Sequence, residues 1–320
     1  AGVGYFLNTT GGIITVNLPV GAAGSSVAMA DYAGTWQTNN VTVSPNGSEK
    51  MGGIAAGVTL STEGQSVTFV YIDGTQGWVN VIDSTSNVRG ATYIVATGGT
   101  PCAGETTGNY KYHTFTGPGT FCVSAIGNGP ACNVVDYLVV AGGGGGAPQH
   151  AGGGGGGGYR TSYCAPAGSV PVTATGYPIV AGGGGAGGSK TPVSTDGTNG
   201  TPSTFSSITS AGGGGGRSWP GSNGLAGGSG GGGGSGTPPL GGPGCGGAGD
   251  TPATPVSQGY DGGDGTLYTT GGGGGGGGGA AVGSDGLPAT PSAGPGGAGA
   301  QNNIDTNNYY WAGGGGGGNH

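Results

Sequence analysis

The sequence predicts β-rich N-terminal modules followed by a bundle of polyglycine II helices, with essentially no α-helix. The chain has 320 residues and 91 glycines, of which 23 lie in residues 1–140 and 68 in residues 141–320. In the second part, glycine forms uninterrupted runs, and nearly all aromatic, Pro, Asn and Thr residues lie between the runs. A flexible Gly/Ser tether would mix these residue types throughout. The segregation therefore favours an ordered body.

Residues 1–95 are expected to form a β module. Short segments rich in Val, Ile, Thr and Tyr are separated by Gly, Pro and Asn turns, and some of them alternate apolar and polar residues. No segment shows the periodicity of an amphipathic helix. The expected strands lie within GIITVNLP (12–19), SVAMADYA (26–33), NNVTVSP (39–45), GVTLSTEG (57–64) and QSVTFVYIDG (65–74).

Residues 96–140 are expected to form a β segment that links this module to the first glycine run. Within residues 110–140 we predict two or three strands, with tight turns at 117–119 and 127–129. Cys122 and Cys132 flank the second turn and are the most plausible disulfide pair, although strict hairpin register would not place them opposite each other. The five cysteines have none of the spacings of a zinc site, so no metal site is predicted.

Residues 141–320 carry the glycine runs and are predicted to form the polyglycine II bundle. A polyglycine II helix has three residues per turn, a rise of about 3.1 Å and no internal hydrogen bonds. Without Cβ atoms, neighbouring helices can approach until their N–H and C=O groups bond one another. The runs occupy 142–146, 152–158, 182–188, 212–216, 227–236, 241–249, 271–279, 294–299 and 313–318, with DGGDG (261–265) as a further candidate.

Several function classes are excluded by the composition. The six basic residues are scattered singly, so we expect no nucleic-acid partner. No apolar stretch approaches the length that spans a membrane. The many Gly-x-Gly-x-x-Gly matches arise from polyglycine and lack a βαβ context, so no cofactor is predicted. No Ser/His/Asp set has motif support, so we expect no enzyme. Asp261 and Asp264 of DGGDG could bind Ca²⁺ weakly, but an ordinary turn is favoured.

Short phrases around the runs resemble the glycine-rich domain of bacteriophage tail-fibre proteins and of the adhesins at long-tail-fibre tips. Residues 1–95 separately resemble a β module of phage virion structural proteins through GYFLNTTGGIITVNLP, ADYAGTWQTNNVTVSPNGS and VTFVYIDGTQGW. The phrases in the glycine-rich part are TFTGPGTFCVS, VDYLVVAGGGGG, GGGGYRTS, TFSSITSAGGGGG, TPATPVSQGYDGGDG and NYYWAGGGGGG.

The resemblance implies a non-enzymatic, virion-borne adhesin. In the tip adhesins, polyglycine II helices pack as a sandwich, and variable connectors at its far end contact the bacterial receptor. The implied partners are a host cell-surface receptor, either an outer-membrane protein or a glycan, and other tail-fibre subunits. A homotrimeric fibre and a monomeric tip both remain open, because the N-terminal module does not resemble the known attachment domain. The alternative is a structural subunit of an extracellular or virion filament assembled end to end.

The receptor contacts are predicted by counting runs. If the first run leaves the strands and successive runs alternate in direction, the connectors 147–151, 189–210, 237–240 and 280–293 lie at the far end. The near end then receives the connectors 159–169, 217–224, 250–270 and 301–311. Arg217 and Trp219 of the second of these form a rival patch, because both residue types are enriched in interface hot spots. Counting DGGDG as a run would reverse every later assignment. The predicted contacts are Gln149, His150, Lys190, Asp196, Asn199, Leu240, Asp285 and Leu287.

Overall fold

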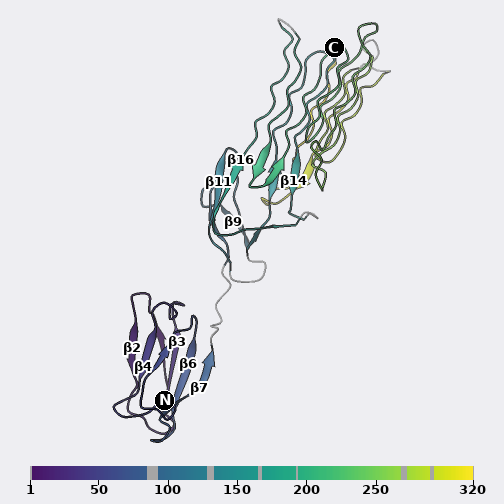
Figure 1. Cartoon of the computed structure of the whole chain (residues 1–320). Coiled ribbons are helices and arrows are strands. Elements are labelled where there is room, and N and C mark those ends of the chain that lie inside the picture. Colours follow the sequence, from purple (N-terminus) through teal and green to yellow (C-terminus); the bar gives the residue numbers. More distant parts are fainter. Residues whose placement is uncertain are drawn as a thin grey trace. The chain divides into compact units, whose positions relative to one another are not determined.

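The computed structural model forms two compact units, Ala1–Gly90 and Ala91–His320 (Figure 1). It describes residues 2–84, 93–127, 133–164, 168–191, 194–267, 272–288 and 292–319. These ranges contain β-strands and no helix, which agrees with the sequence prediction. Accordingly, no helix in them is long and apolar enough to cross a membrane.

The N-terminal unit consists of a four-stranded sheet, ordered β1-β3-β6-β7, and a three-stranded sheet, ordered β2-β4-β5. The pairs β1–β3 and β2–β4 are parallel, and the others are antiparallel. Each of the five predicted segments contains one strand, and β1 and β7 lie outside them. The bounds are β1 (Val3–Leu7), β2 (Ile14–Asn17), β3 (Ser26–Asp31), β4 (Val41–Ser44), β5 (Val58–Leu60), β6 (Ser66–Tyr71) and β7 (Trp78–Ser84).

Alternation along the strands builds the core of this unit. In β3 and β6 every second side chain is buried, because successive residues of a strand point to opposite faces. Met29 and Phe69 therefore pack inward with Trp36 and Trp78, both of which are completely buried.

Asp31, at the end of β3, is a buried carboxylate with four backbone donors. Its Oδ1 accepts hydrogen bonds from the N–H groups of Gly34 (2.9 Å) and Thr35 (3.2 Å), and its Oδ2 accepts them from Trp36 (3.3 Å) and Gly64 (3.0 Å). Burial alone would raise the pKa of Asp31, but these donors together hold it below its ordinary value. The charged carboxylate thus fixes the loop after β3 to the turn before β6.

The strands of the second unit gather at one end of it, which we call the strand end (Figure 1). A five-stranded sheet has the order β18-β17-β16-β11-β8, and four two-stranded sheets accompany it. The bounds are β8 (Val95–Thr97), β9 (Glu105–Thr107), β10 (Tyr110–Tyr112), β11 (Gly119–Ala125), β12 (Val134–Val135), β13 (Leu138–Val140), β14 (Tyr159–Thr161), β15 (Val170–Pro171), β16 (Gly176–Val180), β17 (Ser203–Phe205), β18 (Ile208–Ser210), β19 (Ala300–Asn302) and β20 (Tyr309–Trp311).

The segment predicted as a separate linker, 96–140, is part of this second unit. Its strand β11 pairs with β16 from the glycine-rich part, and Phe121 on β11 packs against Tyr177 and Phe205. The boundary between the units therefore falls at residue 90 and not near 140. Cys122 is a free cysteine, and Cys132, with most of the predicted turn at 127–129, lies outside the described residues.

From residue 141 onward, thirteen extended runs in the described ranges lie side by side along the unit (Figure 1). Each leads from the strand end to the opposite end, which we call the distal end, or returns. Nine correspond to predicted runs, and 195–201, 222–227, 258–265 and 283–287 are additional. The others are 142–146, 152–158, 182–188, 212–216, 229–236, 241–249, 272–279, 293–299 and 313–318.

The hydrogen-bond partners of a run repeat every three residues. The N–H groups of Gly152, Gly155 and Gly158 donate to the carbonyls of residues 217, 214 and 211, each at 2.8 Å. Those of Gly153 and Gly156 donate instead to residues 274 and 277. A partner number that falls by three marks an antiparallel neighbour, and one that rises by three marks a parallel neighbour. One run thus bonds different neighbours on successive residues.

These bonds arrange the runs in three layers. No backbone hydrogen bond among the described runs joins the first layer directly to the third. The first layer is 182–188, 142–146, 152–158 and 313–318; the middle layer is 195–201, 212–216, 229–236, 272–279 and 293–299; the third layer is 222–227, 241–249, 258–265 and 283–287.

Glycine is required at most positions where two runs face each other. A Cβ atom on Gly231 would meet the carbonyl oxygen of Gly215, and one on Gly155 would meet that of Ser229, both well inside 3.0 Å. Real Cβ atoms essentially never come this close to backbone atoms. The same holds at every third residue of the additional runs, including Gly197 and Gly200.

We expect Asp31→Asn to lower the free energy of unfolding of the N-terminal unit by about 2 kcal/mol, because hydrogen bonds to a charged acceptor are lost. Amide hydrogen exchange in β3 and β6 measures this. Asp73→Asn is the matched control, since Asp73 also accepts backbone N–H groups but is exposed.

The same carboxylate predicts a pH dependence. Because the folded-state pKa of Asp31 is lowered, its contribution is complete above the ordinary value of 3.8 and disappears as the pH falls through the folded-state value. The wild-type unit should lose more stability on acidification than Asp31→Asn. Parallel acid titrations of the two proteins would contradict this role.

We expect Gly231→Ala to destabilise the second unit by about 3 kcal/mol, because backbone atoms on a neighbouring run cannot move aside. Gly183→Ala is the control: the nearest atom to its Cβ would be 3.9 Å away, and a new alanine restricts the unfolded chain. Its stability should stay the same or rise slightly. Thermal unfolding compares the two, and equal losses would argue against the close packing of runs.

Candidate functional site

The distal end gathers connectors from widely separated parts of the chain (Figure 1). Each follows a run that leaves the strand end, as the directions of the hydrogen-bonded neighbours show. The distal connectors are 147–151, 189–194, 217–221, 237–240, 266–271 and 288–292, and residues 192–193, 268–271 and 289–291 lie outside the described ranges.

The additional runs correct the predicted positions of several connectors. The segment 195–201 returns to the strand end, where β17 and β18 form a hairpin, so 189–210 is not one distal loop. Residues 217–221 consequently lie at the distal end, and their assignment to the near end is wrong. DGGDG belongs to the run 258–265 and is not a turn.

Two further predicted connectors are divided in the same way. Of 250–270, residues 250–257 lie at the strand end, and those that follow the run 258–265 lie at the distal end. Of 280–293, residues 280–282 lie at the strand end and 288–292 at the distal end, with the run 283–287 between them. The run 283–287 was missed, and the run 258–265 was given only as the candidate DGGDG (261–265).

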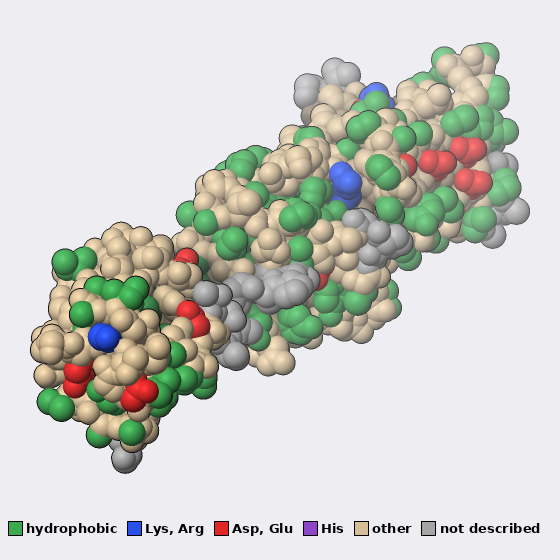
Figure 2. Space-filling model, turned by 60° about the horizontal axis from the view of Figure 1, so that its bottom comes forward, with side chains coloured by type: hydrophobic (Ala, Val, Ile, Leu, Met, Phe, Trp, Pro, Cys, Tyr) green, Lys and Arg blue, Asp and Glu red, His purple; other side chains and the backbone are tan. Residues whose placement is uncertain are grey.

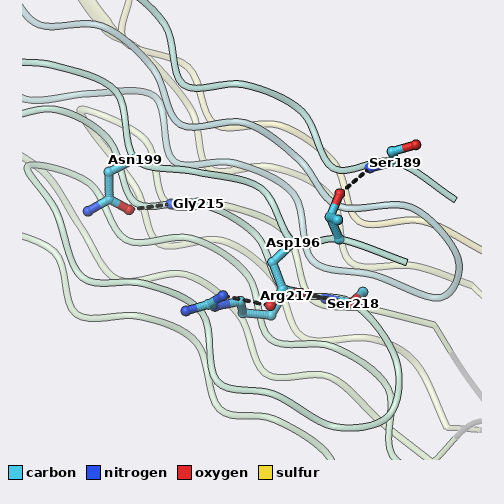
Figure 3. A network of polar contacts seen from close by, with 7 residues as sticks. Ser189, Asp196, Asn199, Gly215, Arg217 and Ser218 are labelled. Atoms are coloured by element: carbon cyan, nitrogen blue, oxygen red, sulfur yellow. Dashed lines mark hydrogen bonds and ion pairs between the residues drawn. The ribbon is translucent and has the colours of Figure 1, made fainter. Parts of the chain in front are cut away.

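Asp196, at the distal start of the run 195–201, binds the distal connector 217–221 (Figure 3). Its Oδ2 lies 2.6 Å from Arg217 Nη1 in an ion pair. Its Oδ1 accepts hydrogen bonds from the Ser218 N–H (2.8 Å) and from the Ser218 hydroxyl (2.7 Å). Arg217 of the rival patch and the predicted contact residue Asp196 therefore belong to one network.

The environment of Asp196 keeps its carboxylate charged. Burial would raise the pKa, but the Ser218 N–H, the Ser218 hydroxyl and the Arg217 guanidinium together lower it below the ordinary value. The side chains of Asp196 and Arg217 are both about 30% exposed, and their charges are paired with each other. The pair thus stiffens the distal end.

A second set of bonds connects the distal connectors 147–151, 217–221 and 237–240, in part through Ser235 at the end of the run 229–236. The Trp219 indole N–H donates to Thr237 Oγ1 at 2.7 Å. The Ser235 N–H donates to the carbonyl of His150 at 2.9 Å, and the Gly221 N–H donates to the carbonyl of Ser235 at 2.7 Å. His150 is buried, so its side chain is not presented to a partner.

The predicted contact residues fall into two groups. Gln149, Lys190, Leu240 and Leu287 are exposed in distal connectors or at their borders, with Leu240 65% and Leu287 51% exposed. The other group lies along the runs, and its side chains bond neighbouring runs. Asn199 Oδ1 accepts from the Gly215 N–H (2.8 Å), and Asp285 Oδ1 accepts from the Asp264 N–H (2.8 Å).

The segment TDGTNGT (195–201) shows the signal that was missed. Its Thr, Asp or Asn, and Gly residues recur at every third position and therefore point to three different neighbours. The threonine hydroxyls of residues 195, 198 and 201 accept the N–H groups of residues 189, 186 and 183 at 2.7–2.8 Å. Asp196 and Asn199 cap a second neighbour, and the two glycines face a third.

Asp261 and Asp264 do the same on the run 258–265. Each Oδ1 accepts a backbone N–H of the run 241–249, from Gly249 and Gly246 respectively, at 2.7 Å. Within the described ranges, no group of three His, Cys, Asp or Glu side chains could hold a metal ion. The two carboxylates therefore connect neighbouring runs, a role that was not predicted from the sequence.

We expect Asp196→Ala to accelerate hydrogen exchange of the Ser218 amide roughly tenfold or more, because a charge-assisted hydrogen bond is removed. Asp264→Ala is the control, since it removes a similar cap from Gly246 far from Arg217. In the wild type, protection of Ser218 should persist below the ordinary carboxyl value of 3.8 and be lost as the pH falls through the folded-state pKa of Asp196, which is lowered. Unchanged exchange at Ser218 would contradict the network.

The glycine-rich part of the chain matches a known protein family. The family model described as a glycine-rich domain matches residues 116–320, which include β11 and all thirteen runs. No curated protein matches the chain. Since the family model covers well over half of the sequence, the chain belongs to the glycine-rich domain family.

Proposed function

We propose that the second unit is a bundle of polyglycine II helices and that the protein is a tail-fibre adhesin. In this proposal the distal connectors bind a receptor on the host cell surface. The N-terminal unit joins the protein to the virion fibre, and binding involves no catalysis. The protein would act in the virion, together with other fibre subunits.

The three-residue repeat supports the polyglycine II assignment. This helix has three residues per turn and no internal hydrogen bonds, so all of its bonds go to neighbours. Ordering a residue costs about 1–2 kcal/mol, and a hydrogen bond returns about 1 kcal/mol net. Such helices are therefore stable only when surrounded. The runs 229–236 and 272–279 meet this condition, because each bonds runs of all three layers.

The cross-linked distal end is the observation that carries the adhesin proposal. Connectors from widely separated parts of the sequence converge there and are joined by the Asp196–Arg217 pair and by the Trp219–Thr237 bond. A surface that is already ordered loses little entropy when it binds. Arg217 and Trp219 would support this surface from within the network.

The exposed side chains indicate the chemistry of the binding surface. Gln149 and Lys190 offer hydrogen-bond donors, and Leu240 and Leu287 offer apolar area. None of these four carries a negative charge, although the chain has a net charge of -7. Such a surface suits a receptor with polar or anionic groups beside apolar ones, as on an outer-membrane protein or a glycan.

We expect the variant Gln149→Ala/Lys190→Ala/Leu240→Ala to bind host cells at least tenfold more weakly than the wild type. The measurement is adsorption of the fluorescently labelled full chain to a panel of intact bacteria that the wild type binds. The matched control is Gln301→Ala/Asn303→Ala/Tyr310→Ala, which changes three exposed residues at the strand end.

Loss of adsorption in the strand-end variant alone, with both variants folded, would contradict the distal assignment. A regular end-to-end polymer of the purified chain in electron micrographs would favour the filament subunit instead. Release of soluble glycan fragments from the cells would show that the protein is an enzyme.

A further inference from the structure

The first layer contains glycines that the chain itself does not require. Its four runs consist of glycine and one alanine, Ala186. At nine of these glycines a Cβ atom would approach no other atom closer than 3.4 Å, which is ordinary contact, and six of the nine also have an N–H group that donates no hydrogen bond within the described ranges. The six are Gly143 (3.4 Å), Gly146 (3.8 Å), Gly184 (3.7 Å), Gly187 (3.7 Å), Gly313 (3.8 Å) and Gly316 (3.9 Å).

The third layer shows that exposed positions of the body accept side chains. Its exposed residues include Ser222, Asn223, Ala226, Cys245, Ala248, Asp261, Asp264, Ser284 and Asp285. Glycine loses more conformational freedom on folding than any other residue, so alanine would be the more stable choice where it fits. Glycine on the outer face of the first layer therefore makes the folded chain less stable than alanine would, and no contact within the single chain explains the choice of glycine.

The same six glycines have unused backbone groups. Their N–H groups donate no hydrogen bond within the described ranges. The carbonyl oxygens of Gly184, Gly187, Gly313 and Gly316 accept none there either. Some exposed N–H groups elsewhere are capped by side chains, as on Gly183 by Thr201. Donors and acceptors on this face thus recur with the three-residue spacing that joins the layers inside the unit.

We propose that the outer face of the first layer pairs with the same face of a second copy of this chain. The occupant must lack Cβ atoms and must supply both donors and acceptors at this spacing, and the face itself has these properties. An interface made of one patch on both partners is the usual arrangement of a two-fold dimer. Backbone would then pack on backbone, as it does between the layers.

The charge distribution permits this approach. The four runs of the first layer contain no charged residue. Several acidic side chains of the glycine-rich unit lie close together on the face that Figure 2 shows. The third layer carries Asp261, Asp264 and Asp285. Two copies, each with a net charge of -7, can therefore meet through their bare faces without bringing carboxylates together.

Sedimentation equilibrium of the full chain tests the proposal. We expect the wild type to be a dimer and the variant Gly146→Ala/Gly187→Ala/Gly316→Ala to be a monomer, with its dissociation constant raised at least a hundredfold. The thermal midpoint of the isolated variant should not fall, because each new Cβ has room in the single chain. A wild type that stays monomeric at all concentrations, or a variant that dimerises equally well, would overturn the proposal.

The variant Ala226→Val/Ala248→Val is the control, because it enlarges exposed side chains on the third layer and should remain dimeric. Hydrogen exchange of the wild type gives a measurement that needs no variant. The amides of Gly143, Gly146, Gly184, Gly187, Gly313 and Gly316 should gain protection as the protein concentration rises through the dimerisation range. Fast exchange of these amides in a demonstrated dimer would place the interface elsewhere.

Discussion

The absence of Cβ atoms between the runs is the constraint on which the glycine-rich unit depends. At a facing position such as Gly231, a single methyl group would overlap a backbone carbonyl of the next run. Only glycine brings two backbones close enough for direct N–H to C=O bonds on several sides. The unit therefore has little side-chain core away from the strand end and is held together by hydrogen bonds between runs. The unit is stable only when each run has its full set of neighbours, because a missing neighbour leaves a row of backbone N–H and C=O groups without hydrogen-bond partners.

Side chains have a defined task where a row of neighbours stops. The oxygen atoms of Thr198, Asn199 and Asp264 accept N–H groups that have no carbonyl opposite them. Each of these oxygen atoms takes the place of a carbonyl that a neighbouring run would supply. The same logic appears in the N-terminal unit, where the carboxylate of Asp31 collects four backbone donors of two loops. In both units, acidic residues are used as acceptors within the fold.

The dense glycine runs and five of the seven N-terminal strands could be predicted from the sequence, because composition and alternation are local properties. Three of the four additional runs were missed, and the fourth, 258–265, was given only as the candidate DGGDG (261–265), since uninterrupted glycine was taken as the mark of a run. In 195–201, glycine is needed only at residues 197 and 200, where that face meets another run, and Thr, Asp and Asn occupy the outer faces. A search for glycine at every third residue would have found them.

The predicted site depended on that count, so one missed run moved Arg217 and Trp219 to the opposite end. Bonds between residues far apart in the sequence, such as Asp196 with Arg217, carry no local pattern and could not be inferred. They show that a side chain at the distal end is not free to bind a receptor when it is already bonded to a neighbouring connector. Asp196 lies at the distal end, but its carboxylate is bonded to the neighbouring connector 217–221. Lys190 makes no described side-chain hydrogen bond, and the apolar side chain of Leu240 is exposed. A rigid backbone lattice that immobilises some distal side chains can hold the others at fixed positions, which is what recognition of a surface receptor requires.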